Sequence, residues 1–122
     1  MGDPVRVLVV DDQEVVRNAA RTVLEAAFDF QPVGEVASGV EALTAIEELK
    51  PDLVLLDLRM PDMDGIETAQ RIWATGRDTV VVLMSSDDNV RAHSPDTMAF
   101  VAKHRLKAAV LRELWARLAP SG

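Results

Sequence analysis

The sequence predicts a doubly wound α/β fold with a five-stranded parallel sheet and helices on both faces. Short, nearly continuous apolar runs rich in β-branched residues alternate with segments whose apolar residues recur at helical spacing. This alternation implies right-handed crossovers between parallel strands. No internal repeat or long Pro/Gly/Ser-rich linker interrupts the pattern, so we expect residues 1–122 to form a single domain.

The first half of the chain supplies three predicted strands and two predicted helices. Residues 5–10 form a β-branched apolar run, which is typical of a strand buried on both faces. Apolar residues then recur at helical spacing over residues 13–27. The same signals predict the next three elements: a strand at 32–37, a helix at 39–49, and a strand at 53–56 that ends at Asp57.

The second half continues the alternation but contains one irregular segment. A helix is predicted at 66–74, strands at 79–84 and 98–102, and a last helix at 106–118. Residues 87–96 are polar and weakly amphipathic, and Pro95 excludes a regular helix interior. We therefore expect a shortened or irregular fourth helix there. In the last helix, Leu111 and Trp115 are expected to widen the core face, the alternative being an exposed aromatic anchor for a partner.

The composition excludes several classes of protein. Twenty acidic and thirteen basic residues give a net charge of −7, which argues against binding nucleic acid or anionic membrane through bulk charge. The absence of cysteine excludes disulfides, thiol catalysis and zinc–thiolate sites. No apolar run approaches the ~20 residues of a membrane span, and no signal peptide opens the chain. We expect a soluble, cytoplasmic protein.

Chemically active side chains follow four of the predicted strands. Asp11-Asp12 follow the first strand, Asp57 ends the third, Ser85-Ser86 follow the fourth and Lys103 follows the fifth. Because ligands bind at the carboxyl ends of such strands, we expect these side chains to meet at one edge of the sheet. Each residue also fits a structural role by itself. Asp11 with Glu14 fits a helix capping box, and Asp57 fits an Asx turn. Ser85 fits a second helix cap, and Lys103 fits a solvated lysine.

Together these residues predict a cation site. Two like charges ~4 Å apart cost about 4 kcal/mol at an effective dielectric of about 20, so clustered carboxylates need compensation. Two or three carboxylates with waters suit Mg²⁺, and the lysine adds a positive charge. A cation beside a carboxylate, a hydroxyl and an ammonium is a set for phosphoryl transfer, in which the carboxylate attacks phosphorus and forms an acyl phosphate.

Two sequence motifs are specific enough to indicate a protein family. They are Val7-Leu8-Val9-Val10-Asp11-Asp12 and Asp57-Leu58-Arg59-Met60-Pro61-Asp62-Met63-Asp64-Gly65, with Asp57 placed 45 residues after Asp12. Over essentially its whole length the sequence resembles the receiver domain of bacterial two-component response regulators, either stand-alone or excised. The resemblance implies a flavodoxin-like (βα)5 fold with strand order 2-1-3-4-5. It also implies a signalling domain that is not a turnover enzyme.

The resemblance implies a metal site and a phosphoacceptor. Asp57 would accept a phosphoryl group from a histidine kinase or a phosphotransfer protein. Mg²⁺ would be bound by Asp57, directly by Asp12, partly through water by Asp11, and by the backbone carbonyl of Arg59. Four further aspartates, Asp62, Asp64, Asp87 and Asp88, are candidates for the rim of the site.

The resemblance also implies a switch. The hydroxyl of Ser85 would contact the phosphoryl group, with Ser86 as its small neighbour, although a shift by one residue would make Ser86 the donor. Lys103 would pair with the phosphate, and Phe100 falls at the position of an aromatic rotamer switch. The output surface, and a possible homodimer interface, would be the face of the fourth helix, fifth strand and last helix. The output partner itself stays unassigned.

Two departures from the family pattern leave alternatives open. His104 stands where the family usually has a proline after a cis bond, so a trans Lys103–His104 bond is expected. Lys103 lies only 18 positions after Ser85, about one helical turn short of the usual interval. A shorter fourth helix implies an unusual partner surface, a weakened switch or a harmless deletion. We also hypothesise that Arg59 pairs with Asp87 across the mouth of the site and slows hydrolysis of the acyl phosphate.

Two other functions compete with a phosphorylated receiver. A pseudo-receiver would keep the fold as a protein-binding module with weak or no switching. A Mg²⁺-dependent phosphatase with an aspartyl nucleophile is disfavoured, because Arg59 occupies the position where such enzymes place a general acid.

Overall fold

The computed structural model describes residues 2–86 and 99–120. These residues form five strands: β1 (Val5–Val10), β2 (Phe30–Val36), β3 (Leu53–Asp57), β4 (Val80–Ser85) and β5 (Ala99–Ala102). The α-helices of the described residues are α1 (Glu14–Ala26), α2 (Gly39–Leu49), α3 (Gly65–Ala74) and α4 (Ala108–Leu118). A short 3₁₀ helix, η2 (Lys103–Arg105), connects β5 to α4.

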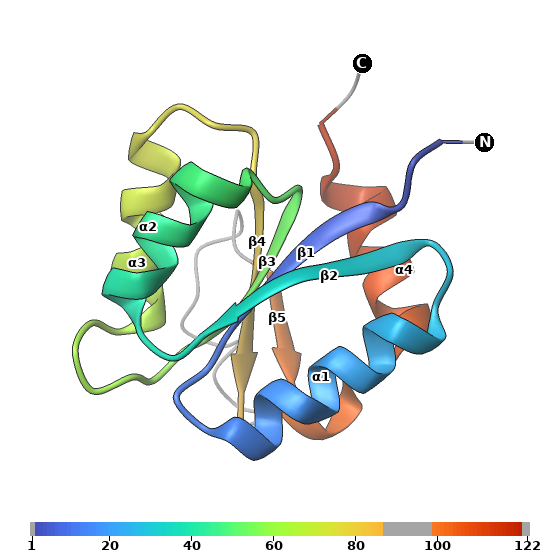
Figure 1. Ribbon diagram of the computed structural model, residues 1–122, viewed down its shortest axis with the longest axis horizontal. Coiled ribbons are helices and arrows are strands. Elements are labelled where there is room, and N and C mark those ends of the chain that lie inside the picture. Colours follow the sequence, from blue (N-terminus) through green and yellow to red (C-terminus); the bar gives the residue numbers. More distant parts are fainter. Residues whose placement is uncertain (1, 87–98, 121–122) are drawn as a thin grey trace.

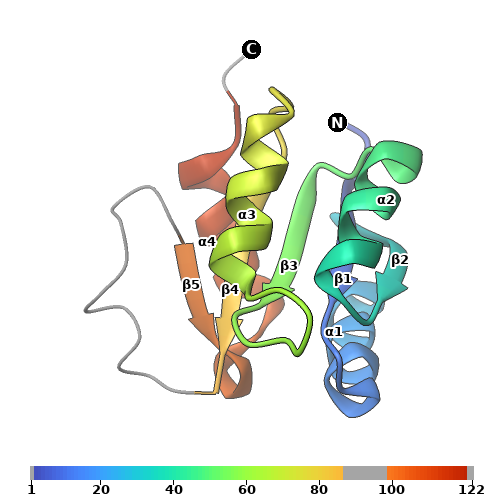
Figure 2. The same cartoon turned by 90° about the vertical axis from the view of Figure 1, so that its left-hand side faces the viewer.

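All neighbouring strands pair in parallel, in the order β2-β1-β3-β4-β5. This confirms the predicted doubly wound sheet and its strand order. Helices α1 and α4 cover one face, and α2 and α3 cover the other (Figures 1 and 2). The chain adds β2 on one side of β1 and then returns to add β3 on the other, so the strand order switches between β1 and β3. Ligand sites of open α/β sheets lie at this point, beyond the carboxyl ends of the strands.

The central strands form two cores because successive side chains point to opposite faces. Val7 and Val9 face the core on the α1 and α4 side, whereas Leu8 and Val10 face the core on the α2 and α3 side. All four are fully buried, which explains why the run reads as continuously apolar instead of alternating. Complete burial of each such side chain contributes about 1.5–3 kcal/mol.

The predicted boundaries differ from the observed ones by two residues in two places and elsewhere by at most one residue. Strand β2 begins at buried Phe30, which pairs in register with Val5, two residues before the predicted start at Pro32. The strand tolerates Pro32 because it lies at the sheet edge, where the register shifts between Val7 and Leu8. The last helix begins at Ala108, two residues later than predicted, because residues 103–105 form η2.

The last helix confirms the prediction of a widened core face. Leu111 is buried, and Trp115 is partly buried against the same core as the aliphatic residues of α4.

The Lys103–His104 bond is trans, as expected from the missing proline. The predicted irregular fourth helix and Asp87 lie outside the described residues. Within the described ranges, no helix is both long and apolar enough to span a membrane.

Candidate functional site

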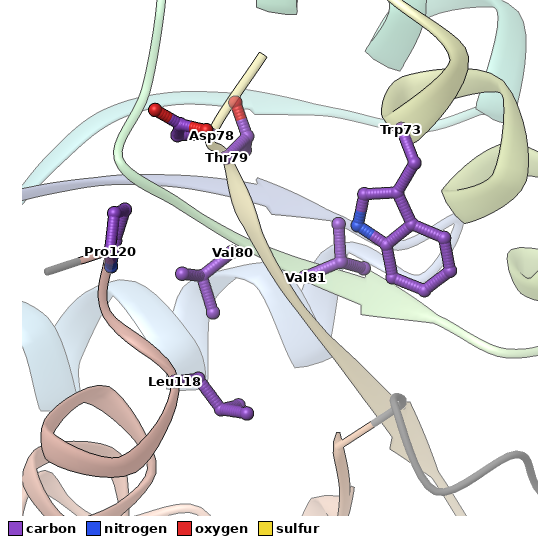
Figure 3. A pocket seen from close by; sticks show the side chains of 7 residues that line it. All are labelled: Trp73, Asp78, Thr79, Val80, Val81, Leu118 and Pro120. Carbon is purple, nitrogen blue, oxygen red and sulfur yellow. The ribbon is translucent and has the colours of Figure 1, made fainter. Parts of the chain in front are cut away.

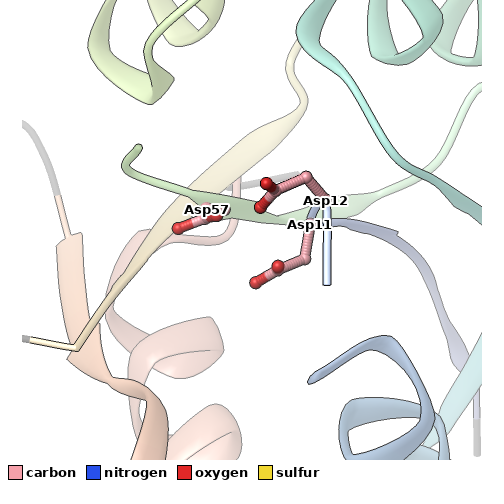
Figure 4. Close-up of side chains that lie close together, drawn as sticks. All are labelled: Asp11, Asp12 and Asp57. Atoms are coloured by element: carbon pink, nitrogen blue, oxygen red, sulfur yellow. The ribbon is translucent and has the colours of Figure 1, made fainter. Parts of the chain in front are cut away.

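Three carboxylates meet at the carboxyl ends of β1 and β3. Asp11 and Asp12 directly follow β1, and Asp57 is the last residue of β3. The parallel register pairs Val10 with Leu56, which brings the residues after each strand next to one another. One carboxylate oxygen from each aspartate lies within 4.8 Å of the others (Figure 4). The structure therefore brings together the acidic cluster that the sequence predicts.

The cluster combines buried and accessible carboxylates. Asp11 is 0% exposed and Asp57 is 4% exposed, whereas Asp12 is exposed. The Oδ1 atom of Asp57 accepts a hydrogen bond from the backbone N–H of Arg59 at 3.3 Å, so Asp57 also forms the Asx turn considered as its structural role. The alternative that Asp11 caps α1 is wrong. The N-cap is Gln13, and Asp11 instead accepts its backbone N–H at 2.8 Å.

Lys103 supplies the positive charge of the site. Its Nζ atom lies 2.9 Å from Oδ2 of Asp11 and 3.2 Å from Oδ1 of Asp57. The side chain is only 16% exposed, so the alternative of a solvated lysine is wrong. Three carboxylates and one ammonium leave the cluster with two uncompensated negative charges.

Burial and charge set the protonation of this pair. Burial raises the pKa of Asp57, the neighbouring charge of Asp11 raises it further, and Lys103 opposes both effects. Burial lowers the pKa of Lys103, but the carboxylates of Asp11 and Asp57 raise it more, so the net direction is upward. Lys103 is thus held in its charged form beside a carboxylate whose charge is costly.

The donor set fits a hard divalent cation. The buried Oδ2 atom of Asp11 accepts no well-aligned hydrogen bond from the described residues, and it lies 2.9 Å from the Nζ of Lys103, whose charge Asp57 shares. Because one ammonium serves two buried carboxylates, a bound cation would complete the compensation of this oxygen. The other donors are carboxylate oxygens, which Mg²⁺ prefers.

The cluster opens into a cavity of about 480 Å³ at the same edge of the sheet. Buried Ser85, at the end of β4, and exposed Ser86 line it, as does exposed Arg59 in the loop after β3. The residues that line the cavity are Asp12, Gln13, Asp57, Leu58, Arg59, Ser85, Ser86 and Lys103. A hydroxyl, an ammonium and carboxylates therefore face one solvent-accessible space.

Phe100 does not line this cavity. It lies on β5, opposite Leu83 of β4, and is partly buried against the core on the α2 and α3 side. The structure therefore unites all the predicted site residues except Phe100. Asp87, the partner predicted for Arg59, and Asp88, a further rim candidate, lie outside the described residues.

Asp62 and Asp64 cap helices instead of lining the rim. Asp64 is the N-cap of α3, and its Oδ1 accepts the backbone N–H of Glu67 at 2.8 Å. Asp62 accepts the backbone N–H groups of Gly39 and Val40 at the start of α2, at 3.2 and 3.0 Å. These backbone donors lower the pKa of Asp62. The Asp64-x-x-Glu67 spacing is a capping signal readable in the sequence, whereas the cross-element role of Asp62 is not.

A second cavity, of about 520 Å³, lies at the opposite end of β4. Trp73 of α3 forms one wall, and Leu118 and Pro120 face Val80 from the other side (Figure 3). Among the described residues, Asp78 is the one ionisable side chain that lines it, in contrast to the charge cluster of the first cavity.

Comparisons with known proteins agree with the geometry. The family model of the response regulator receiver domain matches residues 7–114. The transcriptional regulatory protein YhcZ of Bacillus subtilis is 38% identical over 109 residues, covering 89% of this chain and 51% of that protein. Response regulator protein VraR of Staphylococcus epidermidis is 45% identical over 82 residues, covering 67% of this chain and 39% of that protein. The chain thus spans about half or less of these relatives.

Solved structures share this fold. The receiver domain of the response regulator NarL from Mycobacterium tuberculosis superposes with a TM-score of 0.84 at 29% identity, covering 96% of this chain and 98% of that one. The response regulator domain of Thermotoga maritima CheB gives a TM-score of 0.75 at 28% identity, covering 94% and 93%. With the order β2-β1-β3-β4-β5, these likenesses identify a flavodoxin-like fold. The chain belongs to the receiver domain family of two-component response regulators.

Proposed function

We propose that this receiver accepts a phosphoryl group on Asp57, in the presence of Mg²⁺, and thereby switches a protein-interaction surface. The observation that carries the proposal is the convergence of Asp57 with Asp11, Asp12 and Lys103 at the mouth of an accessible cavity. The donor would be the phosphohistidine of a cytoplasmic histidine kinase or phosphotransfer protein.

The chemistry is a single transfer. A carboxylate oxygen of Asp57 attacks the phosphorus of phosphohistidine, an O–P bond forms, and the P–N bond breaks with its electron pair going to the imidazole nitrogen. Lys103 and the hydroxyl of Ser85 would stabilise the transferred phosphoryl oxygens. Mg²⁺, held by Asp11, Asp12, Asp57 and the carbonyl of Arg59, would neutralise negative charge on these oxygens.

Transfer would change the charge at a buried position and bias the fold toward an active state. The aspartyl phosphate replaces one negative charge by about −1.5 to −2 at neutral pH, beside Lys103 and Ser85. Ser86 would be the small neighbour of Ser85. The side chain of Phe100, on β5, would change its rotamer in response to phosphorylation. The output surface, and a homodimer interface, would lie on the face that includes β5 and α4. In this proposal the chain makes no direct contact with nucleic acid or membrane and turns over no substrate.

The main alternative is a pseudo-receiver that binds proteins without phosphorylation. It is motivated by the trans Lys103–His104 bond in place of the proline usual in the family. The ion pairs of Lys103 with Asp11 and Asp57 favour the phosphorylated receiver instead, because the lysine reaches the site without that proline.

Intact mass distinguishes these functions. The protein is incubated with Mg²⁺ and a small acyl phosphate, in parallel with Asp57→Asn and with Asp78→Asn, a matched change at the second cavity. We expect a Mg²⁺-dependent gain of one phosphoryl group in the parent and in Asp78→Asn, and none in Asp57→Asn. No gain, together with no binding of beryllofluoride, would establish the pseudo-receiver. Rapid turnover of the donor would indicate a phosphatase.

A further inference from the structure

An arginine of α1 holds the backbone that carries the acidic pair. The Nη1 atom of Arg17 donates a hydrogen bond to the carbonyl oxygen of Asp11 at 2.7 Å. That oxygen belongs to the peptide group between Asp11 and Asp12. The N–H of Asp11 donates to the carbonyl of Val36 on β2 at 3.1 Å. The backbone on both sides of the Asp11 Cα is therefore anchored, by a neighbouring strand and by Arg17.

The position of Arg17 is set in turn by Glu35 on β2. Its Nε lies 3.8 Å from Oε1 of Glu35, and Glu35 pairs in register with Val9, two residues before Asp11. The side chains of Arg17 and Glu35 are 19% and 21% exposed, so the ion pair is partly shielded from solvent. One turn later on the same helix, Arg21 places Nη1 2.5 Å from the other oxygen of Glu35. Two arginines thus share Glu35, but only Arg17 is bonded to the backbone of the acidic pair.

We propose that Arg17, oriented by Glu35, is a positioning residue of the cation site. Through the Asp11 carbonyl it fixes the peptide from which both Asp11 and Asp12 project, so that their carboxylates converge with Asp57. The inference rests on the proposed function in one respect, namely that a divalent cation binds these carboxylates. Positioning partners of metal ligands commonly change metal affinity about 10–100-fold when removed.

The sign of the effect separates positioning from simple charge. A guanidinium near a cation site repels the cation, so neutralising it would strengthen binding if Arg17 acted only through its charge. Loss of positioning would weaken binding. Arg21→Gln is the matched control, since it removes the same charge from the same helix and the same carboxylate partner, yet leaves the Asp11 carbonyl bonded.

The test measures Mg²⁺ binding by calorimetry on the unphosphorylated chain, without a phosphoryl donor. We expect Arg17→Gln to weaken Mg²⁺ binding about tenfold and Arg21→Gln to leave it unchanged or slightly tighter. Arg17→Lys keeps the charge but not the two-branched guanidinium, so it should also weaken binding. Circular dichroism and thermal unfolding in chelator establish that each variant is folded.

A double-mutant cycle tests the role of Glu35. Glu35→Gln should weaken Mg²⁺ binding in the parent and have little further effect in Arg17→Gln, because Glu35 acts through Arg17. Equal or tighter Mg²⁺ binding by folded Arg17→Gln or Arg17→Lys would overturn the proposal and leave the proposed function intact. If the parent itself bound no Mg²⁺, both would fall.

Discussion

Asp57 is a carboxylate whose charge is unfavourable where it lies. It is almost fully buried and close to Asp11, and both conditions raise its pKa. Lys103 compensates only in part, because the same ammonium also pairs with Asp11. Charged groups that lower the stability of the fold in the absence of a ligand are typical of functional sites, where the same groups are needed for binding and chemistry.

Replacing this carboxylate should therefore stabilise the metal-free protein. Because the native pKa of Asp57 is raised, its ionised form opposes folding, and the cost disappears once it is protonated below the ordinary value of about 3.9. Asp57→Asn should increase the free energy of unfolding on the order of 1 kcal/mol at pH 7, since Lys103 offsets part of the unfavourable charge. The gain should fade as the pH falls from the raised native pKa to about 3.9.

Urea unfolding in chelator between pH 3.5 and pH 8 measures the difference. Asp52→Asn is the control, since Asp52 precedes the same strand but is exposed and accepts the backbone N–H of Arg6. A gain that persisted at pH 3.5, or one of equal size in Asp52→Asn, would contradict the electrostatic explanation.

At the scale of elements, the loop from β3 to α3 is held at both ends. The N–H of Gly65 donates to the carbonyl of Leu58 at 2.7 Å, which closes its base. The carboxylate of Asp62 binds the first N–H groups of α2, which ties its middle to the neighbouring helix. The loop carries Arg59, the proposed carbonyl ligand, so its geometry bears directly on the site.

Gly65→Ala should disturb both the fold and the site. A Cβ at this position would lie 2.5 Å from the carbonyl oxygen of Asp57 and 2.8 Å from Cα of Leu58, neither of which can move without shifting the backbone. Overpacking of this kind costs about 1–3 kcal/mol. We therefore expect a lower free energy of unfolding together with slower phosphorylation by a small acyl phosphate.

Gly76→Ala separates the two effects. Gly76 has a φ of 79°, and a Cβ built there has open space around it, so alanine costs about 1–2 kcal/mol through the backbone alone. Phosphorylation should be unchanged in Gly76→Ala, measured at a temperature where both variants are folded. Normal phosphorylation of Gly65→Ala would show that the loop does not position the site.

At the scale of the molecule, one sheet carries two cores and gathers the site at one edge. The carboxyl ends of β4 and β5 point to the edge where the loop after β3 also lies (Figure 2). The opposite edge is stabilised by a contact between distant segments, in which Arg112 of α4 makes a bidentate ion pair with Asp29, the residue before β2. That bond lowers the pKa of Asp29. The site, in contrast, gathers residues from the carboxyl ends of β1, β3, β4 and β5.

Mg²⁺ should stabilise the whole chain, because only the folded state brings the three carboxylates together. The expected gain is about 2.7 kcal/mol at a Mg²⁺ concentration 100 times the dissociation constant, and chelator should reverse it. Thermal unfolding against Mg²⁺ concentration measures this. Asp12→Asn, which removes an exposed carboxylate of the site, should abolish most of the gain, whereas Asp78→Asn should retain it. Equal stabilisation of all three proteins would indicate a general salt effect.

The order of elements and most of the site follow from local patterns in the chain. Continuous apolar runs indicate buried parallel strands, and the residues directly after such strands lie at one edge of the sheet. For this reason the sequence predicts that these side chains lie close together: Asp11, Asp12, Asp57, Ser85 and Lys103. The two motifs then indicated the family and, through it, the strand order. The start of β2 was missed because a proline usually ends a strand pattern, and its place at the sheet edge is not visible locally.

Contacts between residues far apart in the chain required the folded structure. Whether Lys103 is solvated or pairs with Asp11 and Asp57 depends on burial by strands from the whole sheet. The bond from Asp62 to α2, and that from Arg17 to the Asp11 carbonyl, join side chains to backbone groups, which leave no signature in residue identity. Local sequence thus specifies which groups reach the edge of the sheet. Their partners and their pKa values depend on packing, because distance and solvent exclusion set both.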